Sequence, residues 1–183
     1  LGFVVRSIQN CCFAMKIALH YFDKISDATE IAIASERVHH RTNTPIHRPD
    51  PLKFEVERIE CVLHHDYGDS LNRLWKQGEG FINLEHDVAP WPGALTFLWD
   101  CESNCCMYPI LVHGSMNITN FACIKFSSML INMTQGLWDR YPRNEVFDWR
   151  SLDGYFHQAM KERYDLPVHV HKPAVLHCNW SHL

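Results

Sequence analysis

The sequence predicts an α/β fold in which a mixed sheet carries helices on its faces. Three observations support this prediction: a strand, helix, strand succession near the N-terminus, a short apolar strand at residues 81–84, and helical patterns at residues 70–75 and 148–160. The length of 183 residues and the hydrophobic content of 46% suit one compact domain with a sizeable core. We therefore expect a single domain over residues 1–183.

The N-terminal third is expected to open the sheet. Residues 3–8 have the apolar pattern of a strand, residues 12–22 place apolar side chains at helical spacing, and residues 30–34 read as a second strand. Residues 36–53 are polar and hold three prolines and three histidines, which predicts a mobile loop. Residues 54–63 then return to strand character.

The rest of the chain continues this alternation. A helix is expected from about residue 70, a short helix over residues 93–99, strands over residues 107–112 and 121–127, and a helix over residues 152–160. A last short strand should contain the histidines near residue 170. This order of elements favours one α/β layer structure from end to end.

Composition excludes several classes of protein. The net charge of −4 and a pI near 6.3 argue against a protein that binds mainly through broad phosphate neutralisation. Arg6, Asn10 and Lys16 interrupt the apolar N-terminal stretch, which predicts neither a membrane span nor a secretion signal. We therefore expect a cytoplasmic protein without membrane partners, and its eight cysteines are expected to be reduced thiols.

The most informative stretch is the apolar strand that ends in Glu85, His86 and Asp87. Pro90 and Pro92 stop the strand, so the two acids lie at its carboxyl end, where open α/β sheets bind ligands. Side chains two residues apart on a strand point the same way. Glu85 and Asp87 can therefore reach one cation, while His86 faces the other side.

This triplet resembles the DXD motif of GT-A glycosyltransferases, in which acids hold a divalent metal on the diphosphate of a nucleotide sugar. The form Leu-Glu-His-Asp-Val-x-Pro, followed by a helix and a Cys-rich segment, is similar to short glycosyltransferase-like proteins of phages and bacteria. The resemblance covers residues 3–180 and departs from the common pattern in its first acid, Glu85. It implies a GT-A (Rossmann-like) mixed sheet, a nucleotide-sugar donor, and Mn²⁺ or Mg²⁺ held by Glu85 and Asp87.

The resemblance also suggests donor contacts elsewhere. In GT-A proteins the end of the first strand touches the nucleotide, which implies Arg6 or Gln9, although a polar surface loop explains both residues as well. His64, His65 and Asp66 lie between a strand and a helix. Asp66 is expected either to contact the base or diphosphate or to cap that helix.

A second acidic position lies at the start of the helix near residue 152. Asp148 and Asp153 can be explained by helix capping alone, since a carboxylate there is stabilised by free amides and the helix dipole. GT-A proteins nevertheless keep an acid at this place, and Trp149-x-x-Leu152-Asp153 resembles that element. The resemblance implies Asp153 as the general base of an inverting reaction, with Asp148 as second choice; retention stays open.

Three histidines close the chain. His169, His171 and His177 follow the pattern His-x-His-x-Pro-x-x-x-His, which resembles the closing segment of the short glycosyltransferase-like group. The resemblance implies His177 as first metal ligand and His171 as second, which would favour Mn²⁺ over Mg²⁺. The alternative is that these residues are strand histidines hydrogen-bonded in or near the core.

The acceptor is expected to present a hydroxyl group. Lys125, Ser127 and Ser128 are candidates for its side of the site. The phage-like resemblance suggests a modified DNA base or a glycan as acceptor and, for a phage-encoded protein, a location in the host cytoplasm.

Two functions from other classes compete with the transferase. A metal-dependent hydrolase could use Glu85, Asp87 and the C-terminal histidines to activate water. A non-catalytic zinc module is the second, because thiolates and imidazoles suit zinc. Its candidate ligands are Cys101, Cys105, Cys106 and His113.

Overall fold

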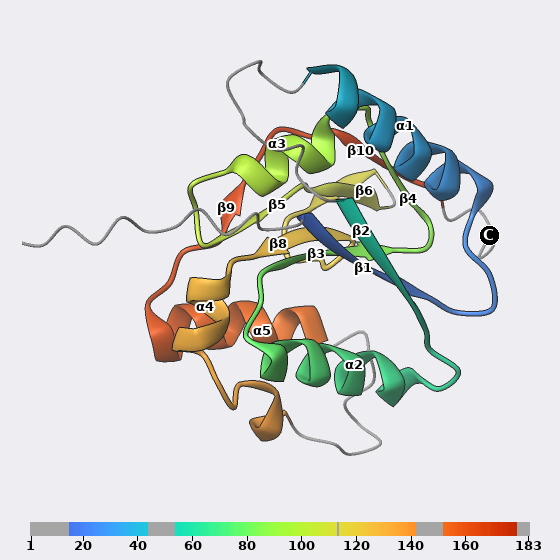
Figure 1. Cartoon of the computed structure of the whole chain (residues 1–183). Helices are drawn as coiled ribbons and strands as arrows, with labels where there is room; N and C mark the ends of the chain where they lie inside the picture. Colours follow the sequence, from blue (N-terminus) through green and yellow to red (C-terminus); the bar gives the residue numbers. More distant parts are fainter. Residues whose placement is uncertain (1–14, 44–53, 113, 142–151, 179–183) are drawn as a thin grey trace, which may run out of the picture.

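The computed structural model describes residues 15–43, 54–112, 114–141 and 152–178. A six-stranded sheet forms the middle layer, with two helices on one face and three on the other (Figure 1). The first pair is α1 (Asp27–Asn43) and α3 (Ala94–Asp100), and the opposite three are α2 (His64–Gln77), α4 (Ser128–Met133) and α5 (Leu152–Ala159). This three-layer arrangement confirms the predicted mixed α/β fold.

The sheet has the strand order β2-β1-β3-β8-β5-β9. β1 is parallel to β2 and β3, β8 is antiparallel to β3 and β5, and β9 is parallel to β5. The strands are β1 (Met15–Tyr21), β2 (Phe54–Glu60), β3 (Phe81–Glu85), β5 (Cys105–Met107), β8 (Cys123–Phe126) and β9 (His169–Val170). Because β1, β2 and β3 are parallel, their carboxyl ends meet at one edge of the sheet.

Two small antiparallel sheets complete the strands. β4 (Val88–Pro90) pairs with β10 (Val175–His177), and β6 (Ile110–Val112) pairs with β7 (Ser115–Asn117). The first pair brings the C-terminal part of the described chain beside the turn that follows β3. Two further helical segments are η1 (Trp138–Arg140) and the π-helical η3 (Met160–Tyr164), which continues α5.

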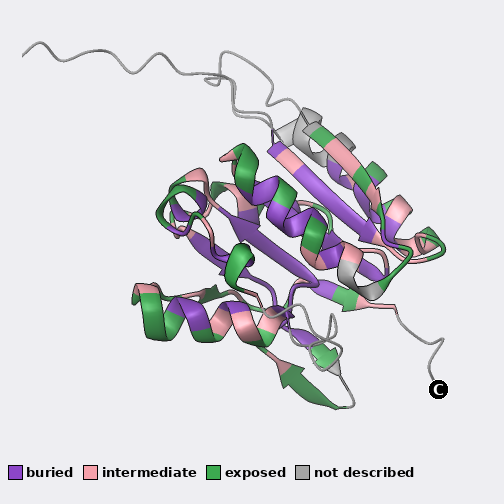
Figure 2. Cartoon of the chain, turned by 90° about the horizontal axis from the view of Figure 1, so that it is seen from below, coloured by how far each residue is buried: buried purple, intermediate pink, exposed green. Residues whose placement is uncertain are grey.

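Each face of the sheet has its own hydrophobic core, so the central strands are buried on both sides (Figure 2). The face beneath α2, α4 and α5 is rich in aromatic rings, with Trp75 and Phe126 at 5.0 Å between ring centroids. The opposite face is mostly aliphatic. Adjacent strand residues alternate between the two cores, so Cys105 belongs to the aromatic core and Cys106 to the aliphatic one.

The predictions for the start of the chain were wrong where the structure describes it. The expected helix over residues 12–22 contains strand β1, and the expected strand over residues 30–34 lies inside helix α1. β1 is covered on both faces, so its apolar run lacks the alternation that marks a half-buried strand. The expected loop over residues 36–53 begins instead as helix up to residue 43, and the expected strand over residues 3–8 lies outside the described residues.

Local signals explain why α1 is a helix. Ser26 precedes it and its hydroxyl accepts a hydrogen bond from the Thr29 amide at 3.1 Å, while Asp27 and Glu30 place charge in the first turn. Further along α1, the buried Glu36 carboxylate accepts hydrogen bonds from backbone amides at the start of α3. α1 therefore also fixes α3 against the sheet.

The later predictions agree with the structure apart from their boundaries. The strands expected at residues 54–63, 81–84 and 121–127 are β2, β3 and β8, and the short helix expected at residues 93–99 is α3. The strand expected at residues 107–112 is divided between β5 and β6. No helix in the described part of the chain is both long enough and apolar enough to cross a membrane.

Candidate functional site

The candidate site is the turn that leaves β3 at the shared carboxyl edge of β1, β2 and β3. Glu85 is the last residue of β3, and His86 and Asp87 form the turn into β4. The His86 carbonyl accepts hydrogen bonds from the Ser26 amide and from the Thr29 hydroxyl, both at 2.9 Å. The start of α1 therefore fixes the backbone on which both acids sit.

The C-terminal strand fixes the same turn from the other side. The Asp87 carbonyl accepts a hydrogen bond from the Cys178 amide at 2.6 Å, and His177 pairs with Val88 in the β4–β10 ladder. The Nε2 atom of His177 lies 3.3 Å from Oδ2 of Asp87. Sequence elements ninety residues apart thus place the predicted acid and the predicted histidine in contact.

One carboxylate oxygen of Asp87 is buried without a hydrogen bond to the described residues. Its side chain is buried, and its Oδ1 atom has no hydrogen-bond partner within the described part of the chain. A buried carboxylate oxygen without a partner is costly, by roughly 1–3 kcal/mol or more. A cation at Oδ1 would remove this cost.

A polar network that includes Tyr67 and Asn83 holds the Glu85 side chain. The Tyr67 hydroxyl on α2 donates to Oε1 of Glu85 at 3.2 Å and accepts a hydrogen bond from Nδ2 of Asn83 at 2.9 Å. Nδ2 of Asn83 also donates to the Phe121 carbonyl at 2.6 Å. Tyr67 and Asn83 are both buried, so the network fixes the direction of the Glu85 carboxyl group.

His20 extends this network into β1, where it lies opposite Glu85 in the strand ladder. Its Nε2 atom is 2.5 Å from the Ser70 hydroxyl, which itself donates to the Tyr67 carbonyl, and its ring meets the Tyr67 ring edge-on. Burial lowers the pKa of His20 to about 3. His20 is therefore a neutral, structural part of the site.

The charges of the site repel one another. Burial, followed by the nearby charge of Asp87, raises the pKa of Glu85 to about 8, and the charge of Asp153 acts in the same direction. The Tyr67 hydrogen bond opposes this rise but does not cancel it. A bound cation would reverse the repulsion and favour the ionised form of Glu85.

Asp153 comes from the first turn of α5 and lies close enough for its charge to act on Glu85. Its Oδ1 atom accepts a hydrogen bond from the Gly154 amide at 2.6 Å. Burial raises the pKa of Asp153, although the amides of Gly154 and Asp153 itself oppose the rise. Asp148, the second choice for a base, lies outside the described residues.

We call Glu85, Asp87 and His177 the carboxylate site. Two carboxylates and one imidazole are a donor set that suits Mn²⁺, and carboxylate oxygens also suit Mg²⁺. The partnerless Oδ1 of Asp87 and the repulsion felt by Glu85 both favour a cation here. Asp87 and His177 are in contact, whereas the ligand atoms of all three residues do not lie within 4.8 Å of one another. The donor types therefore suit the divalent metal that the sequence resemblance implies, and Glu85 would have to move toward the other two residues to share it.

Other predicted donor contacts have structural roles or are not described. Oδ2 of Asp66 accepts hydrogen bonds from the amides of Val62 at 3.0 Å and Leu63 at 2.8 Å, which caps the start of α2. A nucleotide contact by Asp66 stays a prediction. Arg6 and Gln9 lie outside the described residues.

The candidates for the acceptor side also make hydrogen bonds within the protein. Lys125 is buried and its amine donates to the carbonyls of Trp99 and Cys101. The Ser127 hydroxyl caps α4, and the Ser128 hydroxyl accepts a hydrogen bond from the Gly80 amide at 2.8 Å. These contacts explain the three residues without an acceptor.

His171 lies apart from the carboxylate site. It follows β9, and it shares a cluster with Cys101 and Cys106 in which one ligand atom from each residue lies within 4.8 Å of the others. We call these three residues the thiol cluster. The predicted zinc set was wrong in Cys105, because neighbouring strand residues face opposite cores, and His113 lies outside the described residues.

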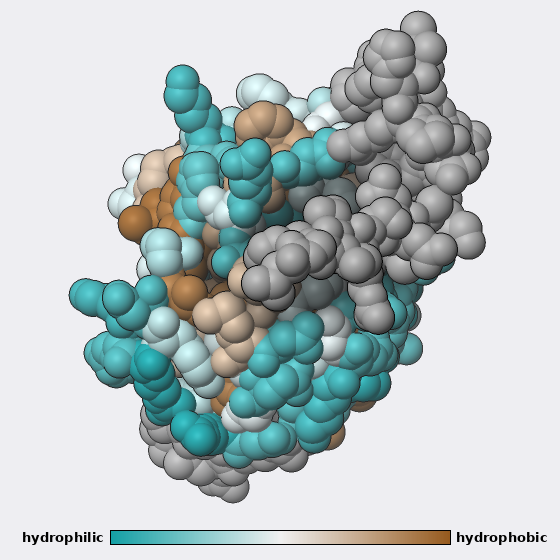
Figure 3. Space-filling model, turned by 60° about the vertical axis from the view of Figure 1, so that its left-hand side comes forward, coloured by the Kyte–Doolittle hydropathy of each residue, from teal (hydrophilic) through white to brown (hydrophobic). Residues whose placement is uncertain are grey.

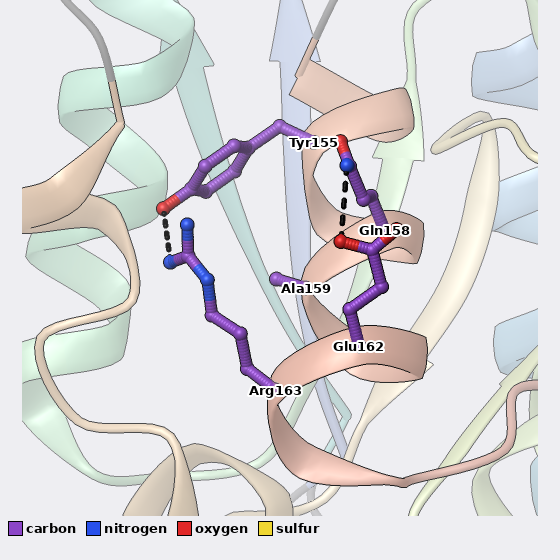
Figure 4. Close-up of a pocket in the computed structure, with 5 residues that line it drawn as sticks. All are labelled: Tyr155, Gln158, Ala159, Glu162 and Arg163. Carbon is purple, nitrogen blue, oxygen red and sulfur yellow. Dashed lines mark hydrogen bonds between the residues drawn. The ribbon is translucent and has the colours of Figure 1, made fainter.

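The pocket on the outer side of α5 and η3 is small. Its volume is about 70 Å³, whereas sites for small molecules usually measure about 300–1,000 Å³ (Figure 4). Its polar groups also satisfy one another, with Gln158 donating to Glu162 at 3.1 Å and Arg163 donating to the Tyr155 hydroxyl at 3.2 Å. This pocket is not suited to a nucleotide sugar.

Sequence analysis missed the network residues Tyr67, Asn83 and His20. Asn83 offered a signal, since an amide inside the apolar run of β3 must find hydrogen bonds when the strand is buried. Tyr67 could be found only once α2 was known to begin before residue 70. His20 was hidden by the prediction of a helix over its segment.

The fold of this chain is similar to that of solved structures. It aligns with the crystal structure of a glycosyltransferase involved in the glycosylation of the major capsid of PBCV-1. The alignment covers 92% of this chain and 95% of that chain, at 16% sequence identity and a TM-score of 0.52. The chain has a GT-A-like fold. At this level of identity the likeness concerns the fold alone.

Two further structures align with lower scores. One is 4-diphosphocytidyl-2C-methyl-D-erythritol synthase from Anaerococcus prevotii, over 87% of this chain and 89% of that chain, at 10% identity and a TM-score of 0.48. The other is the galactosyltransferase LgtC in complex with donor and acceptor sugar analogues, over 90% and 87%, at 12% identity and a TM-score of 0.42. In sequence comparisons, no protein family and no curated protein matches this chain.

Proposed function

We propose that this chain is a metal-dependent glycosyltransferase that moves a sugar from a nucleoside-diphosphate donor to an acceptor hydroxyl. The observation that carries the proposal is the buried, partnerless Oδ1 of Asp87, beside Glu85 and His177 at the end of β3. The GT-A-like fold supports it, because ligands of open α/β sheets bind at the carboxyl ends of strands.

Asp87, Glu85 and His177 would hold the cation. A bound Mn²⁺ or Mg²⁺ supplies positive charge that stabilises the diphosphate as it leaves the sugar. The chain contributes the position: the start of α1 and the β4–β10 ladder fix the turn, and Tyr67 orients Glu85. In the absence of the cation Glu85 keeps its proton near neutral pH, so binding of the cation should release that proton.

Asp153 is the residue we assign to the acceptor. Its carboxyl group would accept the proton of the acceptor hydroxyl as the oxygen attacks the sugar. Its raised pKa makes it a better base than an ordinary aspartate, and its place at the start of α5 keeps it near Glu85 without a direct bond between them. Attack from the face opposite the leaving group would give inversion.

A glycan hydroxyl is the acceptor we favour over a modified DNA base. The net charge of the sequence is −4, whereas proteins that hold a duplex usually carry clustered positive charge. The capsid glycosylation named for the aligned PBCV-1 enzyme is compatible with a carbohydrate or protein-linked acceptor.

The test is donor binding followed by turnover. Thermal shift and calorimetry with a panel of nucleoside diphosphates and nucleotide sugars, with and without Mn²⁺, should identify one base whose binding requires the cation. Asp153→Asn should then keep donor binding but lose about 10²–10⁴-fold in transfer. Asp165→Asn, an exposed acid just beyond η3, is the matched control and should change neither.

Two results would count against the transferase. Binding of no nucleotide at any Mn²⁺ concentration would remove the donor from the account. Cleavage of a nucleotide sugar at a rate that no sugar acceptor changes would favour the metal-dependent hydrolase built on the same carboxylate site.

A further inference from the structure

The thiol cluster lies on a different part of the sheet from the carboxylate site. Cys101 directly follows α3, Cys106 is the central residue of β5, and His171 directly follows β9. β5 and β9 are separated from β3 by β8. The cluster therefore joins three elements at the edge of the sheet that ends in β9, on the left in Figure 1.

The backbone fixes each of the three side chains. The Cys106 side chain points into the aliphatic core beneath α3, and its thiol lies 3.5 Å from the Leu98 carbonyl. The His171 amide donates to the Met107 carbonyl at 2.9 Å, which extends the pairing of β9 with β5. Cys101 reaches the same point because α3 ends immediately before it.

Ring contacts hold the His171 side chain in place, but its Nε2 atom makes no hydrogen bond to the described residues. The ring stacks on that of His169 at 4.4 Å between centroids, and Phe97 and Tyr108 pack beside it at 5.2 and 5.6 Å. Its Nε2 atom is buried and has no hydrogen-bond partner among the described residues. A buried imidazole nitrogen next to two thiols is a ready metal ligand.

We propose that Cys101, Cys106 and His171 bind a zinc ion. Ligand atoms around a tetrahedral zinc lie about 3.5–3.8 Å apart, given Zn–S and Zn–N bonds of about 2.3 and 2.0 Å. The present separations of at most 4.8 Å would close to this range by small side-chain movements. Because Cys101 and His171 are partly exposed, a water molecule would complete the fourth position.

The charge balance suits this assignment. Two thiolates and one neutral imidazole cancel the charge of Zn²⁺, so the site adds no net charge beside the buried Lys125. Soft thiolates select zinc over Mn²⁺ and Mg²⁺, which prefer oxygen. The thiol cluster and the carboxylate site should therefore take different metals from the same solution.

The ion would stabilise the segment that leads to the carboxylate site. β9 is an edge strand of only two residues, and five residues separate His171 from His177. The same side of the molecule exposes hydrophobic surface between hydrophilic residues (Figure 3). A zinc ion at the thiol cluster would anchor this short edge to α3 and β5. The proposal does not depend on the proposed transferase activity.

The experiment uses the full chain purified without chelators. Elemental analysis should find about one zinc per chain, and replacement by Co²⁺ should give a thiolate-to-cobalt charge-transfer band. Cys101→Ser and His171→Asn should weaken zinc binding by at least the 10–100-fold typical of losing an outer partner of a metal ligand. The matched control Cys105→Ala, whose thiol lies in the opposite core, should keep the zinc.

Three results would overturn the proposal. The first is a wild-type chain that holds no zinc and gives no cobalt–thiolate band. The second is a free-thiol count that is two too low in the metal-free protein under denaturing, non-reducing conditions. That count would mean that Cys101 and Cys106 form a disulfide and are a redox pair. The third is loss of zinc from a control variant to the same extent as from His171→Asn.

Discussion

The carboxylate site and the thiol cluster are built in opposite ways. The carboxylate site starts from one short stretch, Glu85 to Asp87, to which the chain later adds His177. The thiol cluster has no such centre, since its three residues come from the end of a helix, a strand and a strand exit. A local motif therefore marks the first site, whereas only the topology assembles the second.

The two regions also differ in the chemistry of their donors. Carboxylate oxygens beside an imidazole suit hard cations such as Mn²⁺ and Mg²⁺, and thiolates beside an imidazole suit zinc. Burial, followed by the charge of Asp87, raises the pKa of Glu85 in the carboxylate site, so a cation there would be favoured electrostatically. The donor sets therefore favour a hard cation at the carboxylate site and a zinc ion at the thiol cluster, on different parts of one small fold.

The largest expected effect is a loss of turnover when the carboxylate site is changed and the thiol cluster is left intact. Asp87→Asn should lower turnover about 100-fold or more, because it removes charge that metal catalysis requires, worth several kcal/mol. The zinc content of the thiol cluster should not change. Steady-state kinetics and elemental analysis on one preparation check both statements.

Glu79→Gln is the matched control for that variant. Glu79 is an exposed acid just before β3, whereas Asp87 lies just after it. Equal losses in the two variants would show that charge near the strand, rather than the carboxylate site, controls turnover.

The second prediction concerns the pH dependence of stability in the presence of a chelator. The pKa of Glu85 is raised from 4.5 to about 8, so between these values the folded protein holds a proton that the unfolded chain has released. The free energy of unfolding should therefore fall as pH rises through this window, by about 2 kcal/mol between about pH 6 and 8. Urea unfolding at several pH values measures this slope.

Glu85→Gln removes the titrating group and should flatten the slope. Saturating Mn²⁺ should also reduce it in the wild type, because a cation favours ionised Glu85. An unchanged slope in Glu85→Gln would contradict the assigned pKa shift.

The smallest expected effect comes from the network beneath the carboxylate site. Tyr67→Phe removes the hydroxyl that donates to Glu85 and accepts from Asn83, and should cost about 1–2 kcal/mol of unfolding free energy. It should also weaken Mn²⁺-dependent donor binding, since Glu85 loses its orientation. Tyr155→Phe removes a hydroxyl that donates to the Leu137 carbonyl, and should reduce stability without changing donor binding.

Sequence patterns predicted most of the fold after residue 54 because those elements carry strong signals. β3 is bounded by glycine and by the acidic turn, and α3 follows prolines and Gly93, whose φ of 87° only glycine adopts readily. The N-terminal elements failed for a physical reason. β1 is buried on both faces and α1 contains Ile31 and Ile33, so propensity alone assigned both wrongly.

The residues of the candidate site also fall into those that the sequence predicted and those that it did not. Glu85 and Asp87 could be named because two residues on one strand end need no tertiary information, and a resemblance supplied His177. The roles of Tyr67 and Asn83 depend on how α2 packs on β3, and the position of His171 depends on the pairing of β9 with β5. Neither packing nor strand order can be read from the local pattern.

The most direct test of the central claim is anomalous diffraction from crystals soaked with Mn²⁺ and the nucleoside diphosphate that binds. Data collected at the manganese and zinc edges identify each metal separately. The account predicts a manganese peak about 2.0–2.2 Å from Oδ1 of Asp87, and zinc at the thiol cluster. Manganese at the thiol cluster, or no manganese beside Asp87 when nucleotide is bound, would contradict it.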